Sequence, residues 1–162
     1  PTMNTDDTSG SSNSVDVRSE SLEPPSWEGS LQRYVLSLLN RLSLSSREVS
    51  ILLTDDQTIA DLNARYRNRD EATDVLSFVA EDAEGDPFGD ICQLMGDVVV
   101  DVPLVERQAA AFGVSFEEEL RRVVTHGVLH LAGHQHRSND FQEEPMLRLQ
   151  EELLHQMKER IL

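Results

Sequence analysis

The sequence predicts an α+β domain, in which a small sheet of about four strands packs with helices around one central metal-bearing helix. Segments with strand and helix character are interleaved without the regular alternation that parallel-sheet units require. Residues 123–132 are apolar on nearly every side, unlike a surface helix, and should form the buried axis of the domain. This helix opens with a capping box of Ser115 and Glu118. Four of the five histidines fall within residues 123–136, so we expect the functional site on it.

The first half of the domain has clear periodic signals. Residues 27–42 carry apolar side chains at intervals of three and four, which predicts an amphipathic helix. Residues 47–54 alternate apolar and polar side chains, as a half-buried strand does. Residues 54–56 offer caps for a helix that runs to about residue 66. A strand is predicted at 74–80.

In the second half, residues 81–93 are acidic and contain glycines, so we expect a loop that could act as a lid or guide. Residues 94–100 are predicted to be a buried strand. A helix over 102–112 should end at Gly113. Residues 141–162 have the apolar stripe of a final amphipathic helix.

The two ends of the chain differ in composition. Residues 1–25 are polar, acidic and rich in turn formers, which predicts a disordered acidic tail. Residues 26–162 are then a single domain, long enough to bury a core. The chain contains no signal-peptide pattern and no apolar run approaching the ~18 residues of a membrane span. These features predict a cytoplasmic protein.

The formal net charge of -16 argues against nucleic-acid binding, because phosphate contacts depend on Lys and Arg. Many of the acidic residues, however, lie in the tail, in residues 81–90 and in the last helix, whereas Arg65, Arg67 and Arg69 cluster in one short stretch. Arginine suits bidentate phosphate contact. We therefore expect a local basic groove on an acidic body, with weak and salt-sensitive binding of any nucleic acid.

The histidine spacing is H-x-x-x-H-x-x-G-x-x-H. His126 and His130 lie four residues apart, so on a helix they share one face and can bind one ion. Gly133 is expected to end the helix, so that His136 approaches the same ion from another side. Three imidazoles leave a fourth position open, which is typical of catalytic zinc. The single cysteine, Cys92, cannot build a thiolate site.

The same spacing occurs in metzincin proteases, where a glutamate after the first histidine is the general base. Here that position is Gly127, which cannot move a proton. A peptidase would need another carboxylate near the metal, and Asp97 is the one candidate. The histidines could also be ordinary core residues, although three of them at ligand spacing make this interpretation the weaker one.

Two segments resemble signatures of the YbeY family, which are metal-dependent endoribonucleases that mature ribosomal RNA. Residues 126–136, H-G-V-L-H-L-A-G-H-Q-H, resemble H-G-x-L-H-L-x-G-Y-D-H, with His134 and Gln135 as departures. Residues 62–79, L-N-A-R-Y-R-N-R-D-E-A-T-D-V-L-S-F-V, resemble L-N-x-x-Y-R-x-x-D-x-x-T-D-V-L-S-F-P, with Val79 in place of proline. The resemblance covers about residues 63–136 and implies the same fold.

The resemblance also implies an activity and its residues. It suggests a single-strand-specific endoribonuclease of ribosomal RNA maturation and ribosome quality control, with one Zn²⁺ held by His126, His130 and His136. Arg67 would stabilise charge on the phosphate; by position alone it would be a surface arginine paired with a nearby acid. Small-subunit ribosomal proteins and an assembly GTPase are the implied protein partners.

Several roles stay open at this point. Asp97 could accept the outer N–H of a ligand histidine or cap a turn. His134 could contact substrate or be exposed on the turn. No general base is evident, which leaves two alternatives: the metal-bound water is sufficient, or the 2′-hydroxyl of the RNA is the nucleophile. A ribosome-assembly binding protein with a structural metal is the non-catalytic alternative. The chain has no G-x-x-x-x-G-K sequence, which argues against nucleotide-driven chemistry.

Overall fold

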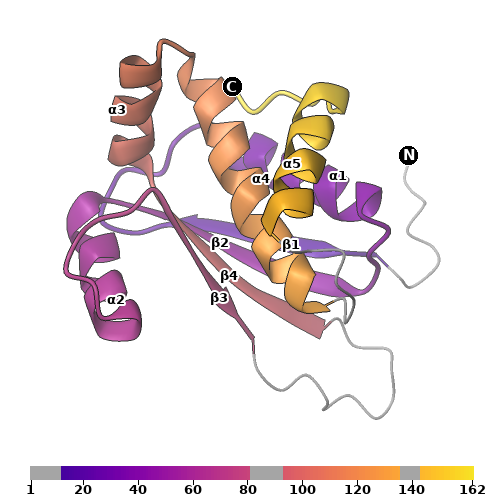
Figure 1. Ribbon diagram of the computed structural model, residues 1–162, viewed down its shortest axis with the longest axis horizontal. Coiled ribbons are helices and arrows are strands. Elements are labelled where there is room, and N and C mark those ends of the chain that lie inside the picture. The colour runs from indigo at the N-terminus through magenta and orange to yellow at the C-terminus, as the bar shows by residue number, and fades with distance from the viewer. Residues whose placement is uncertain (1–11, 81–92, 136–142) are drawn as a thin grey trace.

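The structure, a computed structural model, describes residues 12–80, 93–135 and 143–162. They form a mixed sheet with helices on its faces (Figure 1), which confirms the predicted α+β class. The elements in chain order are β1 (Ser14–Ser19), α1 (Glu28–Arg41), β2 (Arg47–Thr54), α2 (Asp56–Arg67), β3 (Val75–Val79), β4 (Gln93–Asp101), α3 (Val102–Phe112), α4 (Phe116–Gln135) and α5 (Glu143–Gln156). None of the helices in these ranges combines the length and apolar content needed to cross a membrane.

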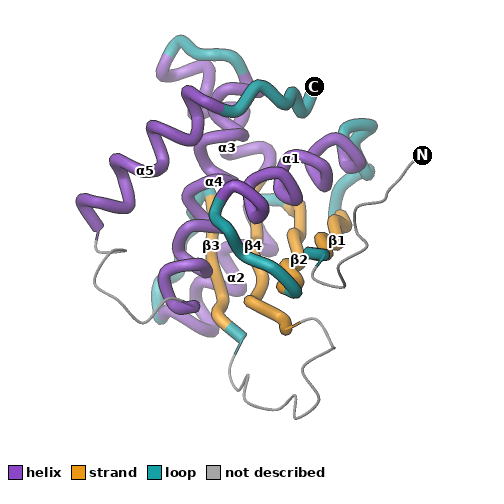
Figure 2. Tube along the Cα trace, turned by 90° about the vertical axis from the view of Figure 1, so that its right-hand side faces the viewer, coloured by secondary structure: helices purple, strands orange, loops and turns teal. Residues whose placement is uncertain are grey.

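The sheet has the strand order β1-β2-β4-β3. β1, β2 and β4 run parallel, and β3 is an antiparallel edge strand beside β4. Figure 2 shows β1 and β3 at the two edges. Within the described ranges, β3 therefore has one side of its backbone without a neighbouring strand, and this is the edge at which the candidate site lies.

β1 corrects the predicted tail. Residues 14–19 were placed in a disordered segment that ended at residue 25, but they pair with β2, and Val15 is buried opposite Val49. The strand was missed because only Val15 and Val17 alternate within a polar stretch, too short a pattern to predict a strand. Pairing with β2 stabilises the strand, although the local sequence pattern is too weak to predict it. Residues 1–11 lie outside the described part of the chain.

Helices cover both faces of the sheet (Figure 1). α1 and α4 lie on one face, where Leu38, Ile51, Val98 and Leu129 belong to the main buried cluster. α2 lies on the other face, over a smaller cluster of Ile59, Leu76 and Val99. α5 packs against α4. The burial of residues 123–125, 127–129 and 131–132 confirms that α4 is a buried helix.

Local capping signals set several helix ends as predicted. Asp55 Oδ1 accepts a hydrogen bond from the Thr58 N–H at 3.0 Å, and Ser115 Oγ accepts one from the Glu118 N–H at 3.0 Å. Gly113 ends α3 at a φ of 71°. The predicted strand 74–80 and helix 102–112 agree with β3 and α3 to within a residue.

Two predicted helix ends were wrong. α4 does not stop at Gly133 but continues to Gln135, because a glycine inside a helix costs only about 1 kcal/mol and Leu131 and Ala132 beside it are buried. α5 ends at Gln156 rather than at residue 162. The last residues turn back instead, and Glu117 accepts a hydrogen bond from the Ile161 N–H at 2.8 Å. The predicted loop at 81–93 lies almost wholly outside the described residues.

Candidate active site

Two predicted metal ligands meet on one face of α4. The Nε2 atoms of His126 and His130 lie 3.0 Å apart, and the two rings are nearly perpendicular, with centroids at 4.5 Å. Two nitrogens bound to one tetrahedral zinc at about 2.0–2.1 Å would lie about 3.3 Å apart. The pair therefore fits a single ion with little adjustment. His126 is half-buried and His130 is exposed, so an ion between them would face the solvent side of the helix.

The orientation of His126 is set from α5. Gln150, which is 5% exposed, places its Oε1 2.8 Å from Nδ1 of His126. An amide oxygen only accepts hydrogen bonds, so Nδ1 carries the proton and Nε2 keeps its lone pair. A hydrogen bond of this kind to the outer nitrogen is usual for a metal-binding histidine. Sequence reasoning missed Gln150, because it lies 24 residues from His126 in the chain.

Asp97, the residue predicted for that role, lies elsewhere. Along β4, Val98 and Val100 face the α4 side, whereas Val99 faces the α2 side. Side chains alternate along a strand, so Asp97 shares the side of Val99 and points away from His126. Burial raises the pKa of Asp97, and Arg18 opposes this shift. The peptidase interpretation thus loses its one candidate carboxylate.

The side chains of the other two histidines of the motif are not described. His136 lies outside the described ranges, and His134 is placed only by its helical backbone. Among the described residues no three His, Cys, Asp or Glu side chains gather in a group that could hold an ion. The set of three ligands stays a prediction, of which the structure brings two together.

Gly127, between the two ligand histidines in sequence, lets α4 approach the sheet. A Cβ at this position would lie 2.8 Å from Val98 Cγ1 and 3.2 Å from Val75 Cγ2. The Gly127 carbonyl accepts a hydrogen bond from Ser77 Oγ at 3.1 Å. The absence of the protease glutamate here is therefore a packing requirement, since no larger side chain fits between α4 and the sheet. This contact places the histidines beside β3.

Arg67 reaches the same region from the opposite face of the sheet. It is the last residue of α2, which ends because Asn68 takes a left-handed conformation at a φ of 62°. Buried Asn63 donates a hydrogen bond to the Glu71 carbonyl at 2.9 Å and holds the following loop. Nη2 of Arg67 donates to the Ser77 carbonyl at 2.5 Å. Since Ser77 is on the edge strand, the guanidinium is held against the edge of the sheet.

These residues line one cavity of about 520 Å³. Its walls come from the end of α2, the segment that leads into and forms β3, one face of α4, and α5. The lining residues are Arg67, Thr73, Asp74, Val75, Leu76, Ser77, Glu119, Arg122, Val123, His126, His130 and Gln150. Arg67, His126 and His130 therefore line the same cavity. Glu119 and Arg122 were missed, although they share the helix face of His126 at intervals of seven and four residues.

Two carboxylates are held in the wall of this cavity. Nε2 of Gln108 lies 3.2 Å from Asp74 Oδ2 and 3.1 Å from Glu119 Oε2. Arg122 lies 3.9 Å from Glu119 Oε1. Glu119 is 4% exposed, so its charge is compensated by these neighbours. The cavity therefore presents both cationic and anionic groups, together with two imidazoles.

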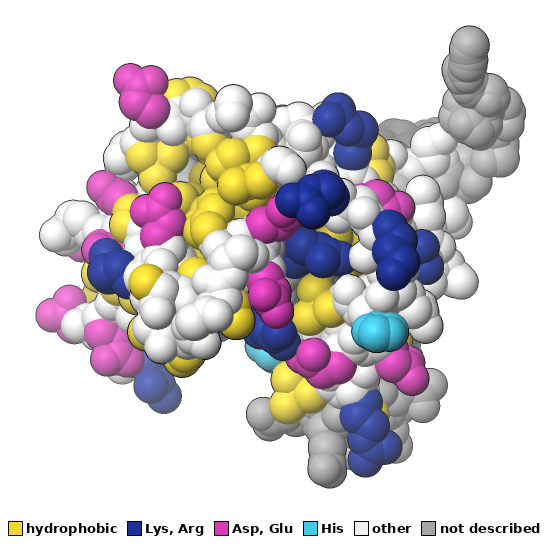
Figure 3. Space-filling model, turned by 90° about the horizontal axis from the view of Figure 1, so that it is seen from above, with side chains coloured by type: hydrophobic (Ala, Val, Ile, Leu, Met, Phe, Trp, Pro, Cys, Tyr) yellow, Lys and Arg dark blue, Asp and Glu magenta, His cyan; other side chains and the backbone are white. Residues whose placement is uncertain are grey.

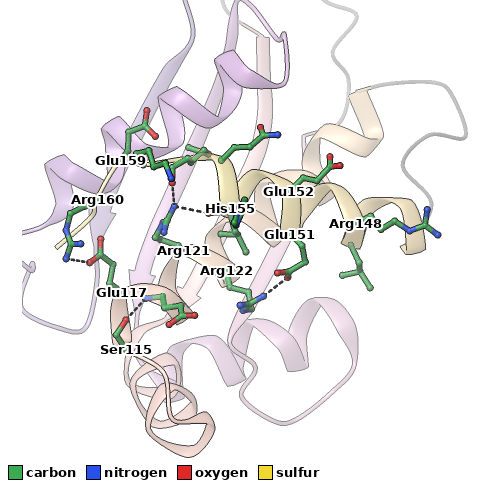
Figure 4. A pocket seen from close by; sticks show the side chains of 16 residues that line it. Ser115, Glu117, Arg121, Arg122, Arg148, Glu151, Glu152, His155, Glu159 and Arg160 are labelled. Atoms are coloured by element: carbon green, nitrogen blue, oxygen red, sulfur yellow. Dashed lines mark hydrogen bonds and ion pairs between the residues drawn. The ribbon is translucent and has the colours of Figure 1, made fainter.

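A larger cavity of about 1240 Å³ lies between the first half of α4, α5 and the C-terminal residues (Figure 4). Acidic and basic side chains are mixed in its lining, and two ion pairs form there: Arg160 bonds to Glu117 at 2.9 Å and Arg122 to Glu151 at 2.5 Å. The face of the molecule seen from above likewise has acidic side chains between basic ones (Figure 3). Because its charges are largely neutralised and it contains neither His126 nor His130, we do not assign the active site there.

An α+β domain with two imidazoles aimed at one point, and an arginine at the rim of the same cavity, defines a candidate metal-dependent hydrolase. A family model of endoribonuclease YbeY matches residues 14–158. The chain belongs to this family. The match begins at the first residue of β1, in agreement with the place of this strand in the sheet.

Similar proteins agree with this assignment. Endoribonuclease YbeY of Borreliella afzelii is 43% identical over 126 residues, which cover 77% of this chain and 83% of the relative. Endoribonuclease YbeY of Treponema denticola is 40% identical over 152 residues, 91% of this chain and 95% of the relative. The solution structure of TM1509 from Thermotoga maritima superposes with a TM-score of 0.61 at 26% identity and covers 87% of both chains.

Proposed function

We propose that this chain is a metal-dependent endoribonuclease that cuts single-stranded RNA in the maturation of ribosomal RNA and in ribosome quality control. Membership of the family supports the activity on RNA. The observation that carries the proposal is that Arg67 of α2 and the His126–His130 pair of α4, two places far apart in the sequence, line one cavity. The cavity is open to a polymer, since His130 and Arg67 are both exposed.

Arg67 has the position of a phosphate ligand. Its hydrogen bond to the Ser77 carbonyl holds the side chain at the edge of β3, and no carboxylate lies within 4.0 Å of it in the described part of the chain. The remaining N–H groups can donate to phosphate oxygens and stabilise the negative charge that grows during phosphodiester cleavage. Arg122, which lines the same cavity, is instead engaged by Glu119 and Glu151.

We further propose that the metal is zinc and that His126, His130 and His136 hold it. The donor set fits, because imidazole suits zinc and the Nε2 atoms of the first two residues converge. When bound, the ion would supply positive charge to polarise the scissile phosphate. Gln150 keeps His126 in the tautomer that such binding needs.

The charge of the cavity bears on RNA affinity. Arg67 is opposed by the carboxylates of Asp74 and Glu119, which line the same space, and the whole chain has a net charge of -16. Few phosphates can be neutralised at once, so binding of free RNA should be weak and salt-sensitive. We propose that small-subunit ribosomal proteins and an assembly GTPase supply further contacts, and that the protein acts in the cytoplasm.

The test is cleavage of end-labelled single-stranded RNA at low salt by the parent protein, by His130→Ala and by a chelator-treated sample. His155→Ala is the matched control, because His155 is an exposed histidine at the end of α5, outside the candidate cavity. We expect cutting by the parent and His155→Ala only. If RNA stays intact with all four samples while it remains bound to the protein, the non-catalytic binding function replaces this proposal.

A further inference from the structure

An exposed aromatic pair lies just outside the candidate cavity. Tyr66, in the last turn of α2, is 58% exposed. Its ring meets the Phe78 ring of β3 edge to face, with centroids 5.5 Å apart and planes at 73°. Tyr66 thus contacts the Phe78 ring, while more than half of the residue remains open to solvent.

Two arginines flank this pair. The guanidinium carbon of Arg67 lies 5.0 Å from the centre of the Phe78 ring, and that of Arg65 lies 5.9 Å from the Tyr66 ring. Neither arginine forms an ion pair with any residue that the structure describes. By contrast Arg69, two residues further on, lies 3.9 Å from Glu71. The aromatic pair therefore sits beside two cations that are available to phosphate.

Arg67 connects the aromatic pair to the cavity. It packs on Phe78, hydrogen-bonds to the Ser77 carbonyl and lines the cavity with His126 and His130. A phosphate held by Arg67 would bring its own nucleotide, or the neighbouring one, next to Tyr66. Exposed aromatic rings beside a cationic path are the usual means by which proteins hold the bases of single strands.

A single exposed aromatic residue is common and needs no explanation. Phe112, at the end of α3, is such a residue: it is 65% exposed, and it has no ring or guanidinium neighbour within the described ranges. Tyr66 differs in having a ring partner, two cations and a shared arginine with the site.

We propose that Tyr66 and Phe78 form a nucleobase-binding subsite, in which one base of single-stranded RNA stacks on the open face of Tyr66 while Arg67 binds the adjacent phosphate. The subsite rests on the proposed function and adds how the substrate is held. It favours single strands, because a base in a duplex is already stacked and paired. It places little demand on base identity, since every base offers a flat face.

The test measures the part of RNA affinity that depends on bases. Fluorescence anisotropy, with chelator present to prevent cutting, compares a short labelled oligouridylate with an abasic ribose-phosphate oligomer of the same length. We expect the parent to bind the oligouridylate roughly tenfold more tightly than the abasic oligomer. Tyr66→Leu should bring this ratio close to one, Tyr66→Phe should retain most of it, and Phe112→Leu should leave it unchanged.

The proposal is overturned if Tyr66→Leu keeps the parent's ratio, or if the parent binds both oligomers equally. Loss of affinity for both oligomers in Tyr66→Leu would also overturn it, since that pattern reports charge or folding and not stacking. Cleavage is scored separately. If the protein cuts RNA but shows no base-dependent binding, the subsite proposal is wrong and the proposed nuclease activity stands. If binding depends on the bases but no RNA is cut, the subsite proposal stands and the proposed nuclease activity is wrong.

Discussion

Gln150 on α5 fixes His126 on α4, through the 2.8 Å contact between its Oε1 and the imidazole Nδ1. The two residues are 24 positions apart, and the contact exists only because α5 packs against α4. This contact keeps the proton of His126 on Nδ1, so that Nε2 has a free lone pair for a metal ion. The readiness of this histidine to bind a metal thus depends on a residue of another helix.

Replacing Gln150 should therefore weaken metal binding without removing a ligand. We expect Gln150→Leu to lower metal affinity by roughly 10- to 100-fold, because Nδ1 loses the acceptor that holds its proton. Competition with a chromophoric chelator measures this constant. Gln156→Leu, a change at the exposed end of α5, is the control and should bind metal as the parent does. Equal affinity in all three proteins would contradict the role of Gln150.

A methyl group at Gly127 should destabilise the fold. An alanine Cβ would lie 2.8 Å from Val98 Cγ1, and overpacking of this kind costs about 1–3 kcal/mol, against a gain of about 1 kcal/mol in helix propensity. We expect Gly127→Ala to lower the free energy of unfolding by about 1 kcal/mol. In urea denaturation the matched control is Gly29→Ala on α1, where the nearest atom would be 3.7 Å away. That variant should unfold at the parent's midpoint or above it.

Lysine should not replace Arg67 in RNA cleavage. Arg67→Lys keeps the charge but loses the planar set of donors that can bind the Ser77 carbonyl and a phosphate together. We expect kcat for RNA cleavage to fall by roughly 100-fold, the cost of losing one donor to a developing charge. Arg69→Lys is the control, since Arg69 is exposed and lies beside Glu71. Its rate should stay near the parent's. Equal losses in both variants would point to general electrostatic attraction.

A buried carboxyl should make stability depend on pH. Asp101 caps α3 by accepting a hydrogen bond from the Leu104 N–H at 3.1 Å and is fully buried. Burial, and then the neighbouring Asp56 carboxyl, raise the pKa of Asp101 to about 7. Between about pH 4 and 7 the folded state keeps this proton and the unfolded state releases it, so stability falls as pH rises through this range. The lowered pKa of Asp56 acts only below about pH 4, where it reduces stability as pH falls.

Asp101→Asn should remove this fall, because an amide has no proton to lose and still caps the helix. A shift of about three pKa units corresponds to about 4 kcal/mol, so we expect the variant to gain up to about that much relative to the parent between pH 4 and pH 8. Urea denaturation across the range, with chelator present, measures the slope. Asp55→Asn makes the same change at the cap of α2 and should keep the parent's slope. A parent whose stability is flat over this range would exclude the raised pKa.

Much of the local structure could be predicted because its causes are local. The side chains of Asp55 and Ser115 reach backbone N–H groups three residues later, so these helix starts depend on neighbours in sequence. Likewise His126 and His130 meet because a helix brings residues four apart onto one face. The errors at Gly133 and at β1 arose where local preference was weak and packing or strand pairing decided the outcome.

By itself, then, the sequence determined the helix that carries the histidines, their spacing, and the two signatures that contain them and Arg67. Only the tertiary structure decided which residues surround them. Asp97 faces away from His126 because β4 directs Val98 toward α4. Gln150 contacts His126 because α5 packs on α4. Arg67 reaches the cavity because β3 is an edge strand. Sequence periodicity specifies which residues share one face of a helix or strand. Which other element packs against that face depends on contacts between segments far apart in the chain.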